Sequence, residues 1–342
     1  MQNKKIKVAV IGGGRSNERD VSLRTSQQIA KALPKNKYNV FLIEITKNKK
    51  WLFKGEFGKN IQKEKEYEID ILSDNNFLKK KIDVAFIALH GKFGEDGKIQ
   101  ALLDLIGLPY TGSGMLSSAL GMSKIKTLEF VAKNKIRIPK HLAIYKDDVK
   151  ADFYKNIKKN IKYPCVVKPS ESGSSIGISI VKSKNQLSKA TDSAFKQDNA
   201  IIIEQYIKGR ELTCGVMGNT NQTELTSLPI VEIITKDTDF FDYQTKYFSN
   251  TVQEICPAKV SPKITKKVQE LAKKVHSALW CDGLTRSDFI LSDRDKKIYF
   301  LEINTIPGQT KASLCPKEAK AIGLKFSDFL EMQIKLAFEK IK

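Results

Sequence analysis

Charged and amide side chains alternate along two neighbouring apolar segments near the C-terminal end of the sequence. Arg286 and Asp288 lie two residues apart in the first segment, and Glu302 and Asn304 lie two residues apart in the second. Alternate residues of a β-strand point to the same face of a sheet, so each pair shares one face of its own strand. If the two strands pair with those faces coinciding, two carboxylates, an amide oxygen and a guanidinium converge.

Such a set of oxygens suits a divalent cation. Carboxylate and amide oxygens are the hard ligands that Mg²⁺ prefers, and Mg²⁺ completes its octahedron with water and nucleotide phosphates. Arg286 would then stabilise negative charge that develops beside the metal, and the backbone N–H of Gly308 could face the same centre. A surface hairpin held by salt bridges is the alternative, although burying these charges unpaired would cost several kcal/mol.

A second polar turn follows an apolar strand at 165–167. Lys168 ends this strand, a turn rich in serine and glycine comes next, and the β-branched segment 176–181 carries the chain away. Such a hairpin offers hydroxyls, backbone N–H groups and one ammonium to an anion, although an ordinary surface hairpin has the same composition. The sequence has no P-loop motif, so a bound ATP would depend on Lys124, Lys168 and this turn. The turn contains Ser170, Ser172, Gly173, Ser174 and Ser175.

The N-terminal end predicts the start of an α/β unit. A strand at 5–11 leads into Gly12-Gly13-Gly14, and a helix follows from about 20 to 33. The N-terminus of such a helix can receive an anion or a polar ligand. The glycines do not form a dinucleotide fingerprint, because Asn17 stands where the third glycine belongs; this argues against an oxidoreductase. Glu18 points into the mouth of the unit, which a tight glycine turn alone does not explain.

His90 occupies a comparable place at the end of a strand. The apolar segment 82–89 predicts a buried parallel strand beside the strand at 38–45. Open α/β sheets bind ligands at the carboxyl ends of their strands, and a lone histidine there fits a structural role equally well. Residues 47–80, which lie between the two strands, are charged and irregular and predict a surface excursion.

The composition of the chain changes near Gly112, and the region of Pro139 starts a second unit. An apolar strand at 201–203 runs directly into an acidic and aromatic stretch. This stretch is either a linker that contacts a nucleobase and ribose or a strand end with a solvated acid. The stretch consists of Glu204, Gln205, Tyr206 and Ile207. The other expected elements are a helix at 117–134, strands at 142–145, 164–168 and 176–181, and a helix at 185–196.

A third unit opens at Glu211. Residues 237–250 form a loop that is rich in aromatic and charged residues, and loops of this kind are often functional covers. A helix begins at Ser261-Pro262, with apolar residues at helical spacing from 268 to 279. His276 lies off that apolar stripe, and we expect it to be solvated.

Length and composition bound the class of protein. A chain of 342 residues is expected to fold as two or three domains. No apolar run is long enough for a transmembrane helix or a signal peptide, so we expect a cytosolic protein. The five scattered cysteines and three distant histidines disfavour a disulfide framework and a zinc site.

The net charge of +21 raises the question of nucleic-acid binding. Only seven of the 59 basic residues are arginine, and the lysines are spread along the chain without a basic stripe interleaved with aromatics. This distribution argues against a nucleic-acid-binding module. We attribute the lysine excess mostly to compositional bias, with attraction of anionic substrates as a side effect.

Together these segments resemble the D-alanine–D-alanine ligase family of the ATP-grasp superfamily over nearly the whole chain. Eight segments match in the family's order, and the resemblance is weakest over residues 46–80. The segments are GGGRSNERDVSL (12–23), LHGKFGEDGKIQ (89–100), LPYTGSG (108–114), VKPSESGSSIGIS (167–179), IEQYIKGRE (203–211), FDYQTKY (241–247), LTRSDFIL (284–291) and LEINTIPG (301–308).

The resemblance implies an α/β (α+β) protein with the three-domain ATP-grasp fold, in which the N-terminal domain is an open parallel α/β domain. Residues 1–113 would form this N-terminal substrate-binding domain. Residues 114–210 would form the central ATP-grasp subdomain, and residues 211–342 the C-terminal ATP-grasp subdomain with the metal and catalytic site. ATP would lie between the last two.

The resemblance also implies roles for individual residues, among them a trio of Glu18, Ser174 and Tyr247 that ties a phosphate lid and a covering loop over the site. The catalytic residues would be Glu18, Ser174, Tyr247, Arg286, Gly308 and Ser313. The substrate-binding residues would be Glu18, His90, Arg286, Gly308 and Ser313. The ATP-binding residues would be Lys124, Lys168, Ser174, Ser175, Glu204, Gln205, Tyr206, Ile207, Glu211 and Lys246. The ligands of two Mg²⁺ or Mn²⁺ ions would be Asp288, Glu302 and Asn304.

The implied activity is ATP-dependent ligation of two D-alanine molecules through an acyl phosphate, for peptidoglycan precursor synthesis. The implied assembly is a cytoplasmic homodimer that binds neither nucleic acid nor membrane. A D-alanine–D-serine or D-alanine–D-lactate ligase of the same family is the alternative. Tyr247 favours D-alanine over D-lactate, whereas Gln309 and Lys311 are uncommon near the second-substrate pocket. Ser123 departs from the Asp that commonly precedes the lysine at 124.

Overall fold

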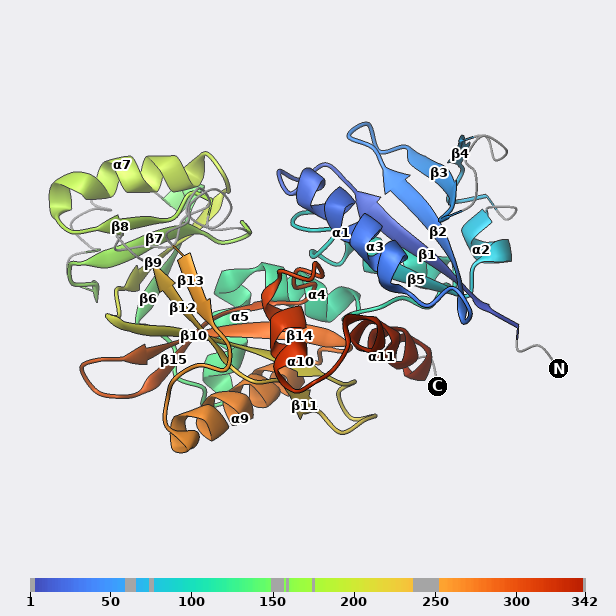
Figure 1. The fold of residues 1–342 in the computed structure, drawn as a ribbon. Helices are drawn as coiled ribbons and strands as arrows, with labels where there is room; N and C mark the ends of the chain where they lie inside the picture. The colour runs from blue at the N-terminus through green and yellow to red at the C-terminus, as the bar shows by residue number, and fades with distance from the viewer. Residues whose placement is uncertain are drawn as a thin grey trace.

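The computed structural model describes residues 4–58, 66–73, 77–148, 157, 160–173, 176–235 and 252–340. Three sheets organise these residues. In Figure 1 the N-terminal sheet lies at the upper right, a unit covered by α7 lies at the upper left, and the C-terminal sheet lies below and between them. Within the described ranges, none of the helices combines the length and the hydrophobicity that a membrane span requires.

The N-terminal sheet has the strand order β4-β3-β2-β1-β5. Its central strand β1 (Ile6–Gly13) pairs in parallel with β2 (Tyr38–Ile45) and β5 (Val84–Ile87), as the apolar segments predict. Residues Val8 to Ile11 are fully buried, as expected of a parallel strand covered on both faces. The helix α1 (Arg19–Ala32) lies against β1 and presents its N-terminus beside the glycine turn.

The prediction of an irregular surface excursion over residues 47–80 is wrong for the part of this range that the structure describes. β3 (Trp51–Glu56) and β4 (Tyr67–Ile69) add two antiparallel strands to the edge of the sheet, which is therefore mixed rather than wholly parallel. Trp51 and Phe53 are buried on one face of β3 because its apolar residues alternate with polar ones. A short helix, α2 (Phe77–Lys81), follows.

Two helices replace the single helix expected over 117–134. After α3 (Lys98–Leu105), α4 (Met115–Met122) ends and α5 (Lys124–Lys133) begins at Ser123, which has extended dihedral angles of φ −84° and ψ 100°. The Ser123 Oγ accepts a hydrogen bond from the Lys126 N–H at 3.5 Å, so this residue caps α5, as an aspartate in its place would.

The middle unit is an antiparallel sheet of order β6-β9-β7-β8 with a core of its own. The helix α7 (Lys184–Phe195) buries Leu187 against Val167 and Ile203 of the sheet. The strands are β6 (His141–Tyr145), β7 (Cys165–Pro169), β8 (Ser179–Val181) and β9 (Ala200–Gln205), and a short helix η2 (Lys146–Asp148) follows β6.

The C-terminal sheet has the order β13-β12-β10-β14-β15, with β11 paired to β10. Its strands are β10 (Gly209–Met217), β11 (Thr226–Ser227), β12 (Val231–Thr235), β13 (Val252–Ile255), β14 (Leu284–Ser292) and β15 (Ile298–Asn304). Its helices are α9 (Pro262–Ala278), α10 (Leu314–Ala321) and α11 (Phe326–Glu339).

The helix α9 begins at the predicted position, but His276 within it is not solvated as expected. The Ser261 Oγ accepts a hydrogen bond from the Ile264 N–H at 3.4 Å, and Pro262 occupies the first turn. His276 is fully buried rather than solvated, and its Nδ1 lies 2.8 Å from the Thr285 Oγ1. Burial lowers the pKa of His276 to about 4, so this imidazole is neutral at physiological pH.

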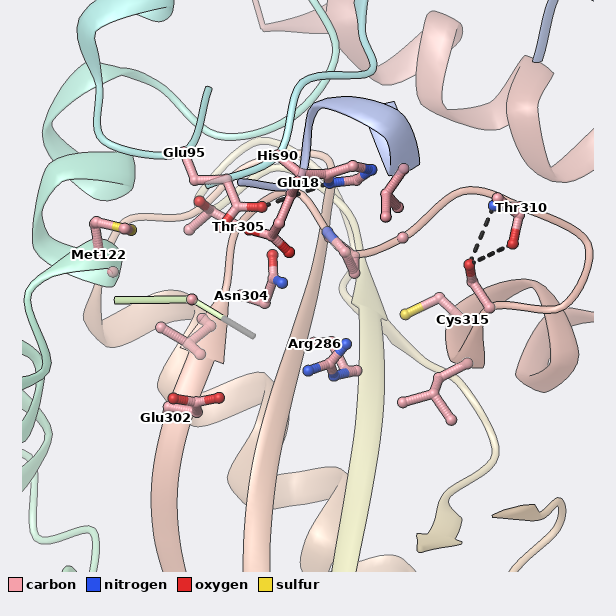
Figure 2. Close-up of a pocket in the computed structure, with 18 of the residues that line it drawn as sticks. Glu18, His90, Glu95, Met122, Arg286, Glu302, Asn304, Thr305, Thr310 and Cys315 are labelled. Carbon is pink, nitrogen blue, oxygen red and sulfur yellow. Dashed lines mark hydrogen bonds and ion pairs between the residues drawn. The ribbon is translucent and has the colours of Figure 1, made fainter. Parts of the chain in front are cut away.

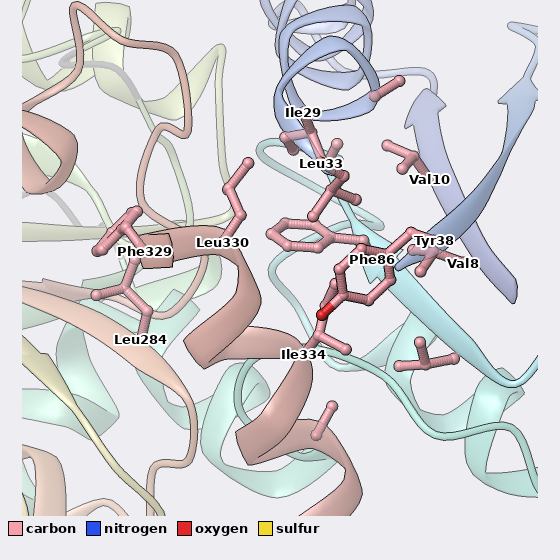
Figure 3. Packing of buried hydrophobic residues seen from close by; sticks show 14 of the residues in the cluster. Val8, Val10, Ile29, Leu33, Tyr38, Phe86, Leu284, Phe329, Leu330 and Ile334 are labelled. Atoms are coloured by element: carbon pink, nitrogen blue, oxygen red, sulfur yellow. The ribbon is translucent and has the colours of Figure 1, made fainter. Parts of the chain in front are cut away.

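The last helix, α11, joins the C-terminal unit to the N-terminal one. Phe329, Leu330 and Ile334 of α11 lie in the same buried cluster as Ile29 and Phe86 of the N-terminal sheet and its covering helix (Figure 3). The N- and C-terminal units therefore share a hydrophobic core, whereas the middle unit has a separate one. The domain limits at 113/114 and 210/211 stay predictions.

Candidate active site

Two cavities meet between the three units. The first has a volume of about 440 Å³ and lies between α1, the segment around His90 and the ends of β14 and β15. The second has a volume of about 520 Å³ and lies between the middle sheet and the C-terminal sheet. Glu302 lines both cavities and therefore marks the boundary at which a group could pass from one to the other.

The charged faces of β14 and β15 coincide, as their alternation predicts. Arg286 stands opposite Asn304 in the register, and Asp288 stands opposite Glu302. Directly opposed residues of an antiparallel pair lie on the same face. Figure 2 shows Arg286, Glu302 and Asn304 in the first cavity at the ends of these strands. The expected convergence is confirmed.

Arg286 and Asp288 form a buried pair. The Arg286 Nε and Nη2 donate hydrogen bonds to the two Asp288 oxygens at 2.8 and 2.7 Å, and the Thr213 Oγ1 donates to Asp288 Oδ1 at 2.6 Å. The two residues are 8% and 6% exposed, which excludes the alternative of a solvated surface hairpin. Burial alone would lower the pKa of Arg286, but the charge and hydrogen bonds of Asp288 raise it, so the guanidinium stays charged.

The oxygens on this face have the chemistry of a magnesium site that is open on one side. Asp288, Glu302 and Asn304 supply two carboxylates and an amide. Over the described parts of the chain, no group of three or more His, Cys, Asp or Glu side chains could hold a metal alone. A cation bound here would therefore need further oxygens, and Mg²⁺ commonly takes them from a phosphate and water. The residues present fit such an ion.

The second cavity contains a buried lysine and a buried glutamate. The Lys168 Nζ lies 2.9 Å from Glu204 Oε1, and Glu204 is 4% exposed, so the alternative of a solvated acid is wrong. The other Glu204 oxygen is buried without a hydrogen-bond partner, so it can accept a bond from a ligand. The remaining predicted residues on the wall of this cavity are Gln205, Tyr206, Ile207 and Glu211.

The polar turn after β7 is packed against Lys124 and Glu18. The Lys124 Nζ donates to the Ser172 carbonyl oxygen at 2.7 Å and lies 3.2 Å from Glu302 Oε2. A Cβ on Gly173 would lie 3.1 Å from Glu18 Oε2, so the turn reaches across to the N-terminal unit. It is not an ordinary surface hairpin. Four predicted site residues lie outside the described residues, namely Ser174, Ser175, Lys246 and Tyr247.

His90 lies beside two carboxylates, those of Glu95 and Glu18, at the top of the first cavity (Figure 2). Its Nδ1 is 3.6 Å from Glu95 Oε1, and its Nε2 is 3.3 Å from the Thr25 Oγ1. Burial alone would lower the pKa of His90, but the hydrogen bond and charge of Glu95 and the charge of Glu18 raise it. The protonated imidazole is therefore more favoured here than in a free histidine side chain.

The segment after β15 also lines the first cavity. The Thr310 N–H donates to the Ser313 Oγ at 3.2 Å, and the Ser313 N–H donates to the Thr310 carbonyl oxygen at 2.9 Å. A Cβ on Gly308 would lie 2.8 Å from the Ser313 Oγ, so a side chain here would force Ser313 or the turn to shift. Gln309, by contrast, is buried against α11, and the Lys311 N–H donates to the Gln28 Oε1 at 3.0 Å.

Several residues of the first cavity were not predicted from the sequence. Val21, Arg24 and Gln28 of α1 line it, and their spacing along one face of the expected helix was the available signal. Glu95 follows His90 by five residues in a glycine-rich turn, and only the folded turn brings the two together.

Two α/β units that close on a cavity with a buried lysine, next to an oxygen-lined β-hairpin, define an ATP-grasp enzyme. Comparison with known proteins identifies the family. The family model described as "D-ala D-ala ligase N-terminus" matches residues 7–113, and "D-ala D-ala ligase C-terminus" matches residues 130–335. The chain belongs to the D-alanine–D-alanine ligase family.

Curated relatives match over their full length. The D-alanine–D-alanine ligase of Carboxydothermus hydrogenoformans is 39% identical over 337 residues, which are 98% of this chain and 99% of the relative. That of Syntrophobacter fumaroxidans is 39% identical over 340 residues, which are 99% of this chain and 100% of the relative.

Solved structures share the fold. The VanG D-Ala:D-Ser ligase from Enterococcus faecalis has a TM-score of 0.86 and 33% identity, covering 98% of this chain and 100% of that one. The D-alanine–D-alanine ligase from Bacillus anthracis complexed with ATP has a TM-score of 0.76 and 30% identity, covering 98% and 99%. The expected ATP-grasp fold is confirmed.

Proposed function

We propose that the protein joins two molecules of D-alanine to D-alanyl-D-alanine for peptidoglycan precursor synthesis, while ATP is converted to ADP and phosphate. One observation carries the proposal in this structure. The first cavity brings Glu18 and His90 to face Arg286 and Gly308, and it meets the second cavity at Glu302. An amino acid in the first cavity can thus present its carboxylate to a nucleotide in the second.

The reaction begins with the donor D-alanine. Glu18 attracts its ammonium, and His90 stands beside the same substrate. The donor carboxylate attacks the γ-phosphoryl group of ATP in line, which gives an acyl phosphate and ADP. Lys124 and Lys168 supply positive charge for the phosphates, and the buried Glu204 with its open acceptor supports a role in binding the adenine and ribose.

The second step joins the acceptor. The uncharged amine of the second D-alanine attacks the acyl carbon, Arg286 and the Gly308 N–H stabilise the oxyanion, and inorganic phosphate leaves as the peptide bond forms. Ser313 faces the carboxylate of the acceptor. The position of Gly308 and Ser313 on one wall of the first cavity supports these roles.

Asp288, Glu302 and Asn304 would hold one or two Mg²⁺ or Mn²⁺ ions. When bound, such ions neutralise the charge of the transferring phosphoryl group. The fork from Arg286 fixes the orientation of Asp288, which lines the second cavity, and the Lys124 Nζ lies 3.2 Å from Glu302 Oε2.

The ATP site would be completed by a lid and a cover. Ser174, Ser175, Lys246 and Tyr247 belong to these segments, and Ser174 and Tyr247 would join Glu18 over the bound substrates. The close approach of Gly173 to Glu18 supports this arrangement. A closed lid protects the acyl phosphate from water. The ATP-binding set is Lys124, Lys168, Ser174, Ser175, Glu204, Gln205, Tyr206, Ile207, Glu211 and Lys246.

The domain limits 1–113, 114–210 and 211–342 are part of the same proposal. The separate core of the middle unit supports a central domain that closes on ATP as a body. A homodimer in the cytoplasm is proposed on family membership alone.

D-serine is the second candidate acceptor. The structural match to the VanG D-Ala:D-Ser ligase favours it, because that enzyme shares the fold at a TM-score of 0.86. The two acceptors differ by one hydroxyl, so the acceptor side of the first cavity decides between them.

The test is an assay of ADP release by the purified protein with ATP and Mg²⁺, with D-alanine as the donor and D-alanine, D-serine or D-lactate as the acceptor. Mass spectrometry identifies the product. We expect D-alanine-dependent ADP release with D-alanyl-D-alanine as the main product. Absence of D-alanine-dependent ADP release would contradict the proposal, and a mixed product with D-serine would replace it by the second candidate.

A further inference from the structure

Two buried glutamines join the segment that follows β15 to the last helix. Gln309 is 2% exposed and Gln333 is 3% exposed. The Gln309 Nε2 donates to the Gln333 Oε1 at 2.8 Å, and the Gln333 Nε2 donates to the Gln309 Oε1 at 3.2 Å. The two amides therefore satisfy each other in a reciprocal pair, 24 residues apart in the sequence.

The surroundings of Gln333 are apolar and rigid. Its neighbours along α11, Phe329, Leu330 and Ile334, are buried in the core that the C-terminal unit shares with the N-terminal sheet. The Gln333 Nε2 also donates to the Phe329 carbonyl oxygen at 3.3 Å, which fixes the plane of its amide. Gln309 is thereby fastened to the same packed body that carries Glu18 and His90.

Gln309 directly follows Gly308, and the Ser313 turn begins one residue later. Hydrogen bonds impose a direction as well as a distance, so the reciprocal pair limits how far the Gly308 N–H can turn. An apolar pair of similar volume would fill the same space without that constraint, because buried polar pairs add little net stability over apolar packing. The hydrogen bonds between the two amides therefore fix the direction of the loop, which apolar packing alone would not do.

We propose that Gln309 and Gln333 are positioning residues that hold the Gly308 N–H and Ser313 in place for the attack of the acceptor amino acid. The inference rests on the proposed function and names a further part of the same site. The pair touches no reacting atom and acts through the loop, because oxyanion donors work only when they are already oriented.

The test uses Gln309→Met, Gln333→Leu and the double variant, with the yield of dipeptide per ADP released as the readout. A single variant leaves one buried amide without its partner, and the loop shifts to satisfy it. We expect each single variant to lower kcat/KM for the acceptor about tenfold. We also expect a lower yield of dipeptide per ADP, because the acyl phosphate is hydrolysed while the acceptor waits. The double variant should stay about as impaired as either single variant, since removing one amide already breaks the reciprocal pair and apolar packing does not restore its direction.

The yield per ADP does not depend on how much of the enzyme is folded. A role in stability alone would lower ADP release and dipeptide formation together and leave the yield unchanged, and that result would overturn the proposal. A double variant that recovers the wild-type yield would overturn it too, because apolar packing alone would then hold the loop. Gln222→Met, at an exposed turn, is the matched control and should behave as the wild type. A wild type that forms no dipeptide would instead contradict the proposed function itself.

Discussion

Arg286 has two tasks in the proposed reaction. A guanidinium carries five N–H donors in a fixed fork, and the Nε and Nη2 bonds to Asp288 use two of them. The remaining donors can serve an oxyanion in the first cavity, which Arg286 lines. One side chain thus orients a proposed metal ligand and stabilises the reacting carbonyl group.

The substitution Arg286→Lys tests both tasks while it keeps the positive charge of the side chain. Lysine keeps the positive charge but has no planar fork, so the bidentate contact with Asp288 is lost. We expect kcat to fall by about 10²–10³, the effect of removing one oxyanion donor, while the Kd of ATP changes little. Steady-state kinetics and calorimetric ATP titration measure the two quantities. Arg294→Lys, at an exposed turn, is the control; an unchanged kcat for Arg286→Lys would refute the assigned role.

His90 gives a pH dependence of stability. Its pKa is raised above the ordinary value of 6.5, with Glu95 and Glu18 overcoming the effect of burial. A raised pKa in the folded state contributes stability below the ordinary pKa, and the contribution is lost as the pH rises through the raised folded-state pKa. The melting temperature of the wild type should therefore exceed that of His90→Gln at about pH 6, and the difference should shrink as the pH rises.

The matched control for this measurement is His141→Gln, since the His141 Nδ1 lies beside the Pro139 carbonyl oxygen rather than a carboxylate. A difference between the wild type and His90→Gln that stays constant across the pH range would mean that His90 stabilises the fold by packing rather than by its charge.

Among the elements of the site, the turns at Gly173 and Gly308 differ in the neighbours that a side chain at the glycine would meet. Gly173 approaches a flexible carboxylate, whereas a Cβ on Gly308 would meet Ser313, whose hydroxyl is hydrogen-bonded to Thr310. The turn at Gly308 therefore cannot accept a side chain without moving.

Gly308→Ala should displace the backbone N–H of that turn. We expect kcat to fall about tenfold to a hundredfold, because small misplacements of an oriented group are costly, with little change in the unfolding midpoint in urea. Gly114→Ala is the control, since its Cβ would have its nearest neighbour at 3.9 Å. Equal kcat values for Gly308→Ala and the wild type would refute the role of the Gly308 N–H in stabilising the oxyanion.

The elements that local patterns define could be predicted, and those that depend on distant contacts could not. The alternation of Arg286 with Asp288 already predicts the shared face of β14, because the period of a strand is local. The break at Ser123 could not be predicted, since a serine inside an apolar helical pattern does not show whether it caps. His276 looked solvated because its partner, Thr285, lies on a strand beyond the end of its own helix.

At the scale of the whole molecule, the first cavity depends on a core that the two ends of the chain build together. Leu330 of α11 is fully buried with Phe86 of β5 (Figure 3), so Glu18 and Arg286 belong to units that pack as one body. The middle unit has its own core and supplies Lys168 and the turn at Gly173. No local pattern in the sequence shows that a C-terminal helix completes an N-terminal core.

This arrangement explains why the reaction needs all three units. In the proposed reaction, the amino acids bind in the shared body and the nucleotide binds where the middle unit faces it across Glu302, which lines both cavities. In this reaction the carboxylate of the donor D-alanine would cross the boundary at Glu302 to take the γ-phosphoryl group.

Transfer of oxygen from D-alanine to phosphate tests that claim directly. The enzyme is supplied with ATP, Mg²⁺ and D-alanine labelled with ¹⁸O in both carboxylate oxygens, and the phosphate released is analysed by mass spectrometry. If the carboxylate attacks the γ-phosphoryl group, each phosphate released with a dipeptide carries one ¹⁸O atom, because the bond from that oxygen to carbon breaks when the acceptor amine attacks. Dipeptide formed together with unlabelled phosphate would contradict the account.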